Sequence, residues 1–310
     1  MFEVAVIIIN YNSSDYTLQC VNSIIEKTNS ELNYQIVIVD NASEMEDFLQ
    51  LQSNINSISF ENLSLHRSKI NTGFGGGNMF GVQFANAEYY AFVNNDSLFN
   101  NDCLSIIKTE MQNNPNLGIC GPKCFKEDGS VLPTLDHFAS PIKELLGRKI
   151  LETINPNEYP NRKKEYTKPQ KGQFVSGSFM MLKSADFNQV GGFDTNIFLY
   201  YEETDLCKRL RKINKFAYLI PNATFVHFHG VSTPRSLAIK KELKLSMLYV
   251  IRKHNGYFWH KFLLIYLSIK YFFSSIFKPK YWKLFATIIT GASLSNSLKM
   301  KQKLWDYKKN

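Results

Sequence analysis

The stretch VAVIIINYN, residues 4–12, decides the fold, because a run of β-branched residues passes directly into polar ones. A buried parallel strand with functional groups at its carboxyl end has this pattern. Apolar residues then recur at helical spacing over residues 14–28, and a second apolar run, residues 35–39, ends in Asp40-Asn41. This order of strand, helix and strand predicts a right-handed βαβ unit.

A third apolar run, residues 89–93, also ends in polar residues, Asn94-Asn95-Asp96. Three strand ends that carry Asn or Asp predict one ligand-binding crevice at the carboxyl edge of an open α/β sheet. Further elements continue the α/β pattern. We expect strands at residues 64–67, 174–182, 217–220 and 224–228, and a helix at residues 202–213.

Composition and charge divide the chain into two parts. Of 310 residues, 44% are hydrophobic and 20% charged, which excludes wholesale disorder and collagen-like repeats. Residues 236–310 hold 15 Lys and Arg against 2 Asp and Glu, whereas residues 1–235 hold 21 against 25. A nucleic-acid-binding protein more often spreads its basic residues over the reading surface, so we expect no nucleic-acid partner. We predict a main domain, residues 1–235, and a helical attachment region, residues 236–310.

The attachment region is rich in aromatic residues. Residues 257–285 contain 12 of them, but the longest uncharged stretch, residues 262–269, is only 8 long, too short to span a membrane. We expect a helix that lies in the membrane interface, with a helix packed on the main domain as the alternative. On a helical wheel one side is polar, although Lys270 falls opposite; its members are His260, Lys261, Ser268, Ser275 and Lys278.

Three further features concern the main domain. Residues 126–172 are polar and rich in Pro, and we expect a loop region on the acceptor side with a short helix near residues 141–151. The five cysteines are odd in number and loosely spaced, which predicts buried thiols rather than a zinc site. No basic leader precedes the first strand, so we expect the chain to stay in the cytoplasm.

Glycines between Asn71 and Asn78 allow backbone to approach a ligand, with a helix expected to start near Met79. The spacing is not that of a dinucleotide or P-loop fingerprint, and a tight turn is the alternative. Asp96, at the end of a buried strand, needs a partner; a cation bridging a diphosphate would supply one, and a helix N-cap is the alternative. His227 and His229 share one strand face, which suits a metal or phosphate as well as a core role.

Acidic residues open the helix expected at residues 202–213. Glu202, Glu203 and Asp205 lie within four positions. They follow an aromatic-rich lead, residues 198–201, with the sequence Phe-Leu-Tyr-Tyr. Burial by these aromatics would raise a carboxyl pKa and suit a general base. The alternative is a helix whose acids and bases simply match its dipole.

Seven segments occur in order over residues 3–235, and together they resemble the family-2 glycosyltransferases of the GT-A fold, closest to the bacterial rhamnosyltransferase-like branch. The resemblance implies a Rossmann-like mixed sheet flanked by helices. The segments are Val6-Ile-Ile-Ile-Asn-Tyr-Asn12, Ile38-Val-Asp-Asn41, Asn71-Thr-Gly-Phe74, Asn94-Asn-Asp96, Gly191-Gly-Phe-Asp194, Tyr201-Glu-Glu-Thr-Asp-Leu206 and His227.

The resemblance implies a role for each matched residue. Asp96 would bind Mn²⁺ or Mg²⁺, with His227 as a further ligand. Glu203 stands where the family carries its base, usually Asp, and the other carboxylate candidates are Glu202 and Asp205. The nucleotide sugar would be held by Asn10, Tyr11, Asn12, Asp40, Asn41, Asn71, Gly73, Gly77, Asn78, Asn94 and Asn95. We assign the acceptor side to Gly177, Ser178, Tyr200 and Tyr201.

The expected activity is inverting transfer of a sugar from dTDP-rhamnose or a UDP-sugar to a lipid-linked glycan. The pathway would be O-antigen, capsule or other cell-surface polysaccharide synthesis, at the anionic inner face of the cell membrane. Two alternatives stay open. A sugar-phosphate nucleotidyltransferase would need basic residues near the first loop, and residues 10–20 contain no Lys or Arg. A non-catalytic nucleotide-sugar-binding module would transfer nothing.

Overall fold

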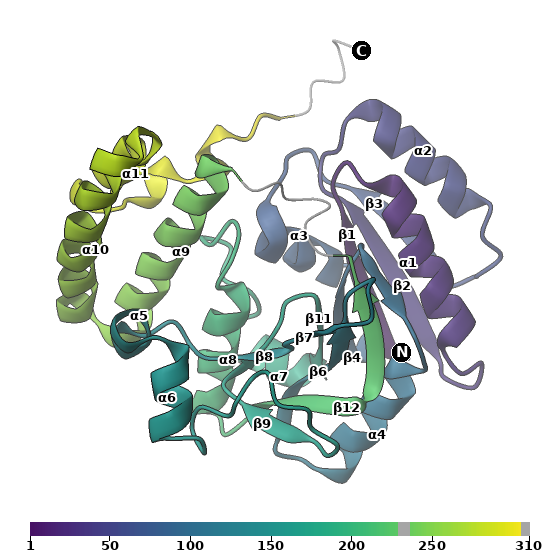
Figure 1. The fold of residues 1–310 in the computed structure, drawn as a ribbon. Coiled ribbons are helices and arrows are strands. Elements are labelled where there is room, and N and C mark those ends of the chain that lie inside the picture. Colours follow the sequence, from purple (N-terminus) through teal and green to yellow (C-terminus); the bar gives the residue numbers. More distant parts are fainter. Residues whose placement is uncertain (229–235, 305–310) are drawn as a thin grey trace.

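A mixed β-sheet forms the centre of the protein (Figure 1). The computed structural model describes residues 1–228 and 236–304. Parallel pairing joins β1 to β2 and β4, and β2 to β3; β11 is antiparallel to β4 and β6. In sheet order the strands are β3 (Leu63–Arg67), β2 (Tyr34–Asp40), β1 (Phe2–Asn10), β4 (Ala87–Asn94), β11 (Phe179–Lys183), β6 (Leu117–Phe125), β12 (Phe216–His227) and β5 (Ser97–Phe99).

Helices cover both faces of this sheet, which explains the unbroken apolar run of β1. Val4, Val6 and Ile8 face one core, whereas Ala5 and Ile7 face the other. One face is covered by α1 (Ser14–Lys27), α2 (Met45–Asn56) and α4 (Cys103–Asn113). The other is covered by α3 (Gly73–Val82), α7 (Ser184–Gln189) and α8 (Glu202–Lys212). The α/β fold class expected from the sequence is confirmed.

The glycine-rich stretch is helical, so the expected helix start near Met79 is wrong: α3 already begins at Gly73. Packing explains the difference. A Cβ added to Gly77 would lie 2.9 Å from Ile9 Cδ1, and one added to Gly81 would lie 2.6 Å from Ile7 Cγ2. These glycines let the helix lie close against β1, an advantage that outweighs their low helix propensity.

Two strand expectations also need correction. The strand expected at residues 174–182 is interrupted between β10 (Phe174–Val175) and β11 by Ser176-Gly177-Ser178. Conversely, the two strands expected at residues 217–220 and 224–228 are one strand, β12, with a register shift between Ile220 and Thr224. Pro221 lies in this shift, where its missing N–H costs no regular ladder hydrogen bond.

Residues 126–172 contain more regular structure than a long loop. Two helices replace the single short helix expected near residues 141–151, because Gly147 separates them with a φ of 79°. The elements are β7 (Val131–Leu132), β8 (Leu135–Asp136), α5 (Pro141–Leu146), α6 (Arg148–Ile154) and β9 (Gln170–Gly172).

The C-terminal region forms a helical layer beside α8, with α9 between α8 and α10 (Figure 1). Its helices are α9 (Leu237–Asn255), α10 (Tyr257–Phe277) and α11 (Trp282–Ile289), with 3₁₀ turns η1 (Pro279–Tyr281), η2 (Leu294–Asn296) and η3 (Leu298–Lys301). They share a separate apolar cluster that includes Leu248, Leu267 and Ile288. Within the described residues, no helix has both the length and the apolar character that a membrane crossing needs.

Candidate active site

A cavity of about 630 Å³ opens at the carboxyl edge of the sheet, in the size range of small-molecule sites. Its walls join strand ends to α8 and to the C-terminal region. Residues from the sequence prediction that line it are Tyr11, Asn41, Asn71, Gly73, Asn78, Asn94, Asn95, Asp96, Gly177, Ser178, Tyr200, Glu202, Glu203 and His227.

Behind the wall, the strand ends are braced by a buried polar network. Asn10 and Asp40 are fully buried. Asn10 Nδ2 donates to Asp40 Oδ1 at 3.1 Å and to Asp47 Oδ2 at 2.8 Å, while Arg67 Nε lies 3.2 Å from Asp40 Oδ2. Burial raises the pKa of Asp40, although hydrogen bonds and Arg67 oppose the shift. Asn10 and Asp40 therefore lie behind the cavity wall and orient their neighbours Tyr11 and Asn41, which reach the cavity.

Asn41 connects the second strand end to the start of α3. Its Nδ2 donates to Asn71 Oδ1 and to the Gly73 carbonyl, both at 3.1 Å, and its Oδ1 accepts from the Thr72 N–H at 3.0 Å. Gly73 has a φ of 75°, and a Cβ there would lie 2.0 Å from the Phe198 carbonyl oxygen. Only glycine fits this close approach.

Two other members of the predicted nucleotide set lie outside the cavity. Gly77 packs against Ile9. Asn12 has a φ of 51°, and its Oδ1 accepts from the Glu44 N–H at 2.8 Å, so the side chain holds the loop that follows β2.

Asp96 and His227 meet at the end of β12. His227 Nε2 lies 3.0 Å from Asp96 Oδ1, and Asn94 Nδ2 lies 3.4 Å from the same imidazole nitrogen. Asn95 turns away from them, since its Nδ2 donates to Ser13 Oγ and Thr17 Oγ1, both at 2.8 Å.

A divalent cation fits the Asp96–His227 pair by donor chemistry. One carboxylate and one imidazole suit Mn²⁺, and Mg²⁺ commonly takes one or two carboxylates together with substrate phosphates. Within residues 1–228 and 236–304, no cluster of three or more His, Cys, Asp or Glu residues could hold a metal. Among these described residues, Asp96 and His227 would offer a cation two ligands, and substrate phosphate oxygens would complete its coordination. His229 lies outside the described residues.

Glu202 and Glu203, on the first turn of α8, both line the cavity. Burial, and then the charge of Glu203, raises the pKa of Glu202 well above its usual value. Glu202 is 2% exposed, and its Oε1 has no hydrogen-bond partner in the described part of the chain. Burial raises the pKa of Glu203 to about 7; Asp136 adds to this shift and Lys143 opposes it.

Asp205 lies on α8 outside the cavity and is fully buried. Its Oδ2 is 2.7 Å from Arg209 Nη2, and its Oδ1 is 2.7 Å from both Lys253 Nζ and His254 Nε2. Burial alone would raise the pKa of Asp205, but the hydrogen bond from His254 and the charges of Arg209 and Lys253 lower it. Asp205 is therefore engaged by Arg209, Lys253 and His254 outside the cavity, whereas both glutamates reach the cavity wall.

Unusual backbone precedes α8. Tyr200 and Tyr201 have φ values of 70° and 73°, a left-handed conformation that costs free energy for residues with a Cβ. Tyr200 faces the cavity, whereas Tyr201 packs against the C-terminal apolar cluster. Ser178, which also lines the cavity, has its Oγ 3.0 Å from Ser176 Oγ.

Sequence reasoning missed part of the wall. The C-terminal region contributes Ser236, Ala238, Ile239, Leu298 and Gln302, and the segment before α8 contributes Phe198 and Leu199. The C-terminal residues are small, apolar or uncharged, so the excess of charge and aromatic residues that marked this region gave no signal for them.

The cavity thus gathers amide side chains, Asp96 and two glutamates at the carboxyl edge of one α/β sheet. Residues 5–191, more than half of the chain, match the model described as Glycosyl transferase family 2. The chain belongs to this family, and the resemblance inferred from the sequence is confirmed.

Two relatives illustrate the similarity. N-acetylglucosaminyl-diphospho-decaprenol L-rhamnosyltransferase of Mycobacterium tuberculosis is 30% identical over 149 residues, which cover 46% of this chain and 48% of that protein. The chain thus spans about half the length of this relative. Rhamnosyltransferase WbbL of Escherichia coli is 24% identical over 262 residues, covering 81% of this chain and 93% of that protein.

Solved structures share the fold. GalNAc-T7 with UDP, GalNAc and Mn²⁺ has a TM-score of 0.58 at 13% identity, covering 79% of this chain and 47% of that one. S. aureus TarS 1–349 has a TM-score of 0.51 at 15% identity, covering 81% and 65%.

Proposed function

We propose that the protein transfers a sugar, with inversion, from a nucleotide-diphosphate donor to a hydroxyl group of a lipid-linked glycan. The observation that carries this proposal is Glu203, a carboxyl group with a pKa raised to about 7, on the wall of the cavity that Asp96 also lines. A general base works best when its pKa lies near the working pH.

Glu203 is proposed as the base. It takes the proton of the acceptor hydroxyl while that oxygen forms a bond to the anomeric carbon. The bond from this carbon to the diphosphate breaks on the opposite face, and the nucleoside diphosphate leaves. Glu202 lies beside Glu203 on the cavity wall, where burial and the Glu203 charge raise the pKa of Glu202 well above the usual value and so disfavour its charged form.

The donor would lie over the strand ends. Tyr11, Asn41 and Asn71 offer aromatic and amide groups to a base and ribose, as the family resemblance implies. Asp96 and His227 would hold Mn²⁺ or Mg²⁺, which neutralises charge on the leaving diphosphate. The names of the two relatives favour rhamnose as the transferred sugar. The proposed donor is dTDP-rhamnose, with a UDP-sugar as the other candidate. The mycobacterial relative's name favours a polyprenyl-diphosphate acceptor.

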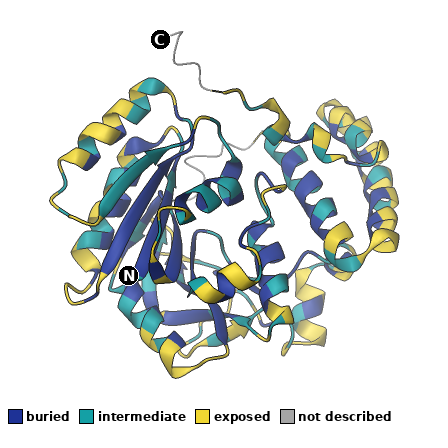
Figure 2. Ribbon diagram, turned by 180° about the vertical axis from the view of Figure 1, so that it is seen from behind, coloured by how far each residue is buried: buried dark blue, intermediate teal, exposed yellow. Residues whose placement is uncertain are grey.

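The outer face of α10 supports attachment to an anionic membrane. The polar side expected from the helical wheel is not the outer side, since His260 and Ser275 are buried. Large apolar side chains instead recur outward at helical spacing, among them Phe258, Phe273 and Phe277, the last 82% exposed. Figure 2 shows exposed residues along this outer side. Exposed lysines stand beside the stripe: Lys261, Lys270, Lys278, Lys280 and Lys283.

An apolar stripe bordered by lysines suits the boundary between acyl chains and anionic headgroups. The proposal keeps the boundary between the main domain and the C-terminal region at residue 235, and it adds a second role for the C-terminal region. Residues 236–310 would both attach the enzyme to the inner membrane face and supply part of the cavity wall, so that the cavity meets its lipid-linked acceptor at that surface.

A binding and turnover screen tests the function. Sugar nucleotides carrying UDP or dTDP should raise the melting temperature in Mn²⁺, since a ligand at 100 times its Kd adds about 2.7 kcal/mol of stability. The best donor should then release its nucleoside diphosphate when a polyprenyl-diphosphate glycan is added. Release of pyrophosphate from a nucleoside triphosphate and a sugar phosphate, with no glycan formed, would contradict the proposal.

A further inference from the structure

We propose that α9 positions the acidic wall of the active site, through Lys253 and His254, which themselves lie outside the cavity. The inference rests on the proposed function of Glu203 as base. It assigns positioning residues to a helix that the sequence marks only as part of a basic, aromatic tail.

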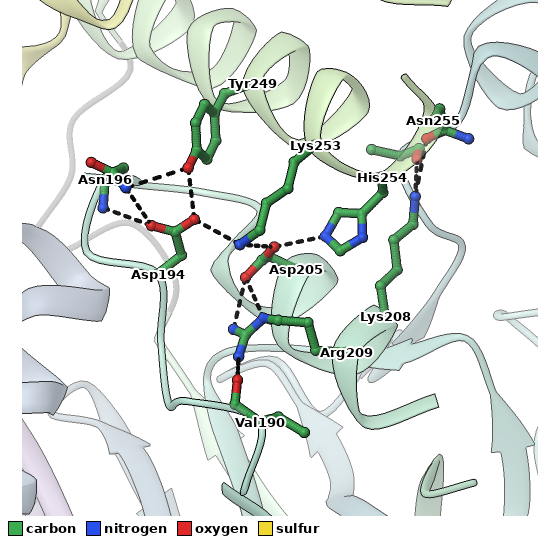
Figure 3. Close-up of polar contacts among 11 residues, drawn as sticks. Val190, Asp194, Asn196, Asp205, Lys208, Arg209, Tyr249, Lys253, His254 and Asn255 are labelled. Carbon is green, nitrogen blue, oxygen red and sulfur yellow. Dashed lines mark hydrogen bonds and ion pairs between the residues drawn. The ribbon is translucent and has the colours of Figure 1, made fainter. Parts of the chain in front are cut away.

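Lys253 joins two carboxylates from different parts of the catalytic domain (Figure 3). Its Nζ lies 2.7 Å from Asp194 Oδ2, in the loop before the aromatic lead, and 2.7 Å from Asp205 Oδ1, in the first turns of α8. His254 Nε2 lies 2.7 Å from the same Asp205 oxygen. Two neighbouring residues of α9 thus hold both ends of residues 194–205.

The segment is also held between its ends. Tyr249 donates its hydroxyl hydrogen to Asp194 Oδ2 at 2.8 Å, and Ser246 Oγ donates to the Leu199 carbonyl at 2.8 Å. All these donors come from α9, at the spacing of successive helical turns. One rigid helix therefore contacts the segment at its start, near its middle and at its end.

Residues 194–205 include two backbone conformations that cost free energy. Tyr200 and Tyr201 both have left-handed backbone, which persists only when the surroundings impose it. Glu203 lies two positions after Tyr201 and two positions before Asp205. The Glu203 side chain projects outward from the axis of α8. A small rotation of α8 about that axis would therefore displace the Glu203 carboxylate relative to the acceptor. An error of about 1 Å at a reacting group can cost about 100-fold in rate.

Within α8, the Asp205 carboxylate is also held by Arg209, whose Nε donates to Asp205 Oδ2 at 2.9 Å. This pair lies inside one helix, but Arg209 Nη1 also donates to the Val190 carbonyl at 2.5 Å, which ties α8 to the end of α7. Lys253 and His254 come from α9, and they tie the same Asp205 carboxylate to a second, separate element.

Lys253→Met removes the bridge, and Lys244→Met is the matched control. Lys244 also lies on α9 and pairs with a carboxylate, Glu144 at 3.6 Å, but this partner is outside residues 194–205. Hydrogen exchange measures positioning without any donor: amides of residues 199–205 should exchange at least about tenfold faster in Lys253→Met, while those of residues 87–94 stay unchanged. Lys253→Arg, which can bridge two carboxylates, should restore protection.

Kinetics provide the second readout. Lys253→Met should lower kcat about 10- to 100-fold with donor KM and UDP affinity near wild type, and Lys244→Met should not. If Lys253→Met proves too unstable, Tyr249→Phe and Asp194→Asn, which each remove another contact between α9 and the segment, replace it in the exchange and kinetic measurements. Where Lys253→Met folds, the double variant Asp194→Asn/Lys253→Met completes a thermodynamic cycle. The Lys253 substitution should cost less in the Asp194→Asn background, as expected for coupled residues.

Equal exchange at residues 199–205 in Lys253→Met and Lys244→Met would overturn the inference, as would fully additive losses in the double variant. Failure of the proposed function looks different. In that case the wild-type chain turns over no sugar nucleotide, while the exchange experiment still decides whether α9 positions the segment.

Discussion

The two walls of the cavity are built in opposite ways. On the nucleotide wall, Asn10, Asp40 and Asn95 are buried and hydrogen-bonded within the first strands and helix of the chain. On the acidic wall, Glu202 has an unpartnered oxygen in the described structure, and two tyrosines have left-handed backbone. The first wall is hydrogen-bonded within its own elements, whereas the second concentrates unfavourable features and, in our proposal, is positioned by α9. Strain and raised pKa values are typical of the place where chemistry occurs.

The largest effect should come from removing the base on the acidic wall. Glu203→Gln keeps the shape and removes the proton acceptor, so turnover should fall about 10²–10⁴-fold while UDP binding stays near wild type. Steady-state kinetics and calorimetry measure the two. Glu203→Asp, the residue usual in the family, should keep substantial activity. Near-normal turnover in Glu203→Gln with a collapse in Glu202→Gln would move the role to Glu202.

The next largest effect should be on membrane binding by the exposed apolar stripe of α10, which we propose brings the acidic wall to its lipid-linked acceptor. Replacing Phe258, Phe273 and Phe277 by Ser should weaken binding of the full chain to anionic vesicles by about 100-fold or more, because burying each Phe is worth about 1.5–3 kcal/mol. Vesicle sedimentation at low salt measures this. Leu49→Ser, an exposed apolar residue on α2, is the control. Equal vesicle binding by the triple variant would assign the stripe to another partner.

On the nucleotide wall, Asp96→Ala should remove the Mn²⁺-dependent part of UDP binding, about 10- to 100-fold in affinity. A carboxylate ligand contributes charge that alanine cannot replace. Thermal shift with UDP, in Mn²⁺ and in EDTA, separates metal-dependent from metal-independent binding. Metal-dependent affinity equal to wild type in the variant would remove Asp96 from the metal site.

A smaller effect should follow from pH. Since burial raises the pKa of Glu203 to about 7, most of the base is protonated and inactive below that pH. The ratio kcat/KM should therefore rise about tenfold per unit as pH increases below 7, and level off above it. A profile that is flat from pH 5.5 to 8 would show that no group with this pKa limits the reaction.

The nucleotide wall was largely predictable from the sequence. A βαβ unit places polar strand ends together, and local patterns were enough to bring Tyr11, Asn41 and Asp96 to one edge. Burial could not be predicted in the same way, so Asn10 and Asp40 were grouped with residues that reach the cavity. Sequence pattern shows which residues end a strand but not which of them a neighbouring loop covers.

The acidic wall was predictable only in its residue types. The family resemblance favoured Glu203 over Glu202 and Asp205, and the structure places both glutamates on the cavity wall and Asp205 outside it. Its partners Lys253 and His254 lie far along the chain, and a basic tail gives no pairing rule. The helix over the glycine stretch was missed because glycine has a poor helix propensity, which close packing on β1 outweighs.

The two ends of the C-terminal layer both return to the cavity, at residues 236–239 and at residues 298–302. They are tied together by Glu242, which accepts hydrogen bonds from Ser297 Oγ at 2.6 Å and from the Leu298 N–H at 2.7 Å. A chimaera that exchanged this layer between two members of the family would therefore exchange the cavity wall together with the proposed membrane-attachment surface. Acceptor preference and site of attachment would be inherited as a single unit, which makes the layer a natural boundary for recombination experiments.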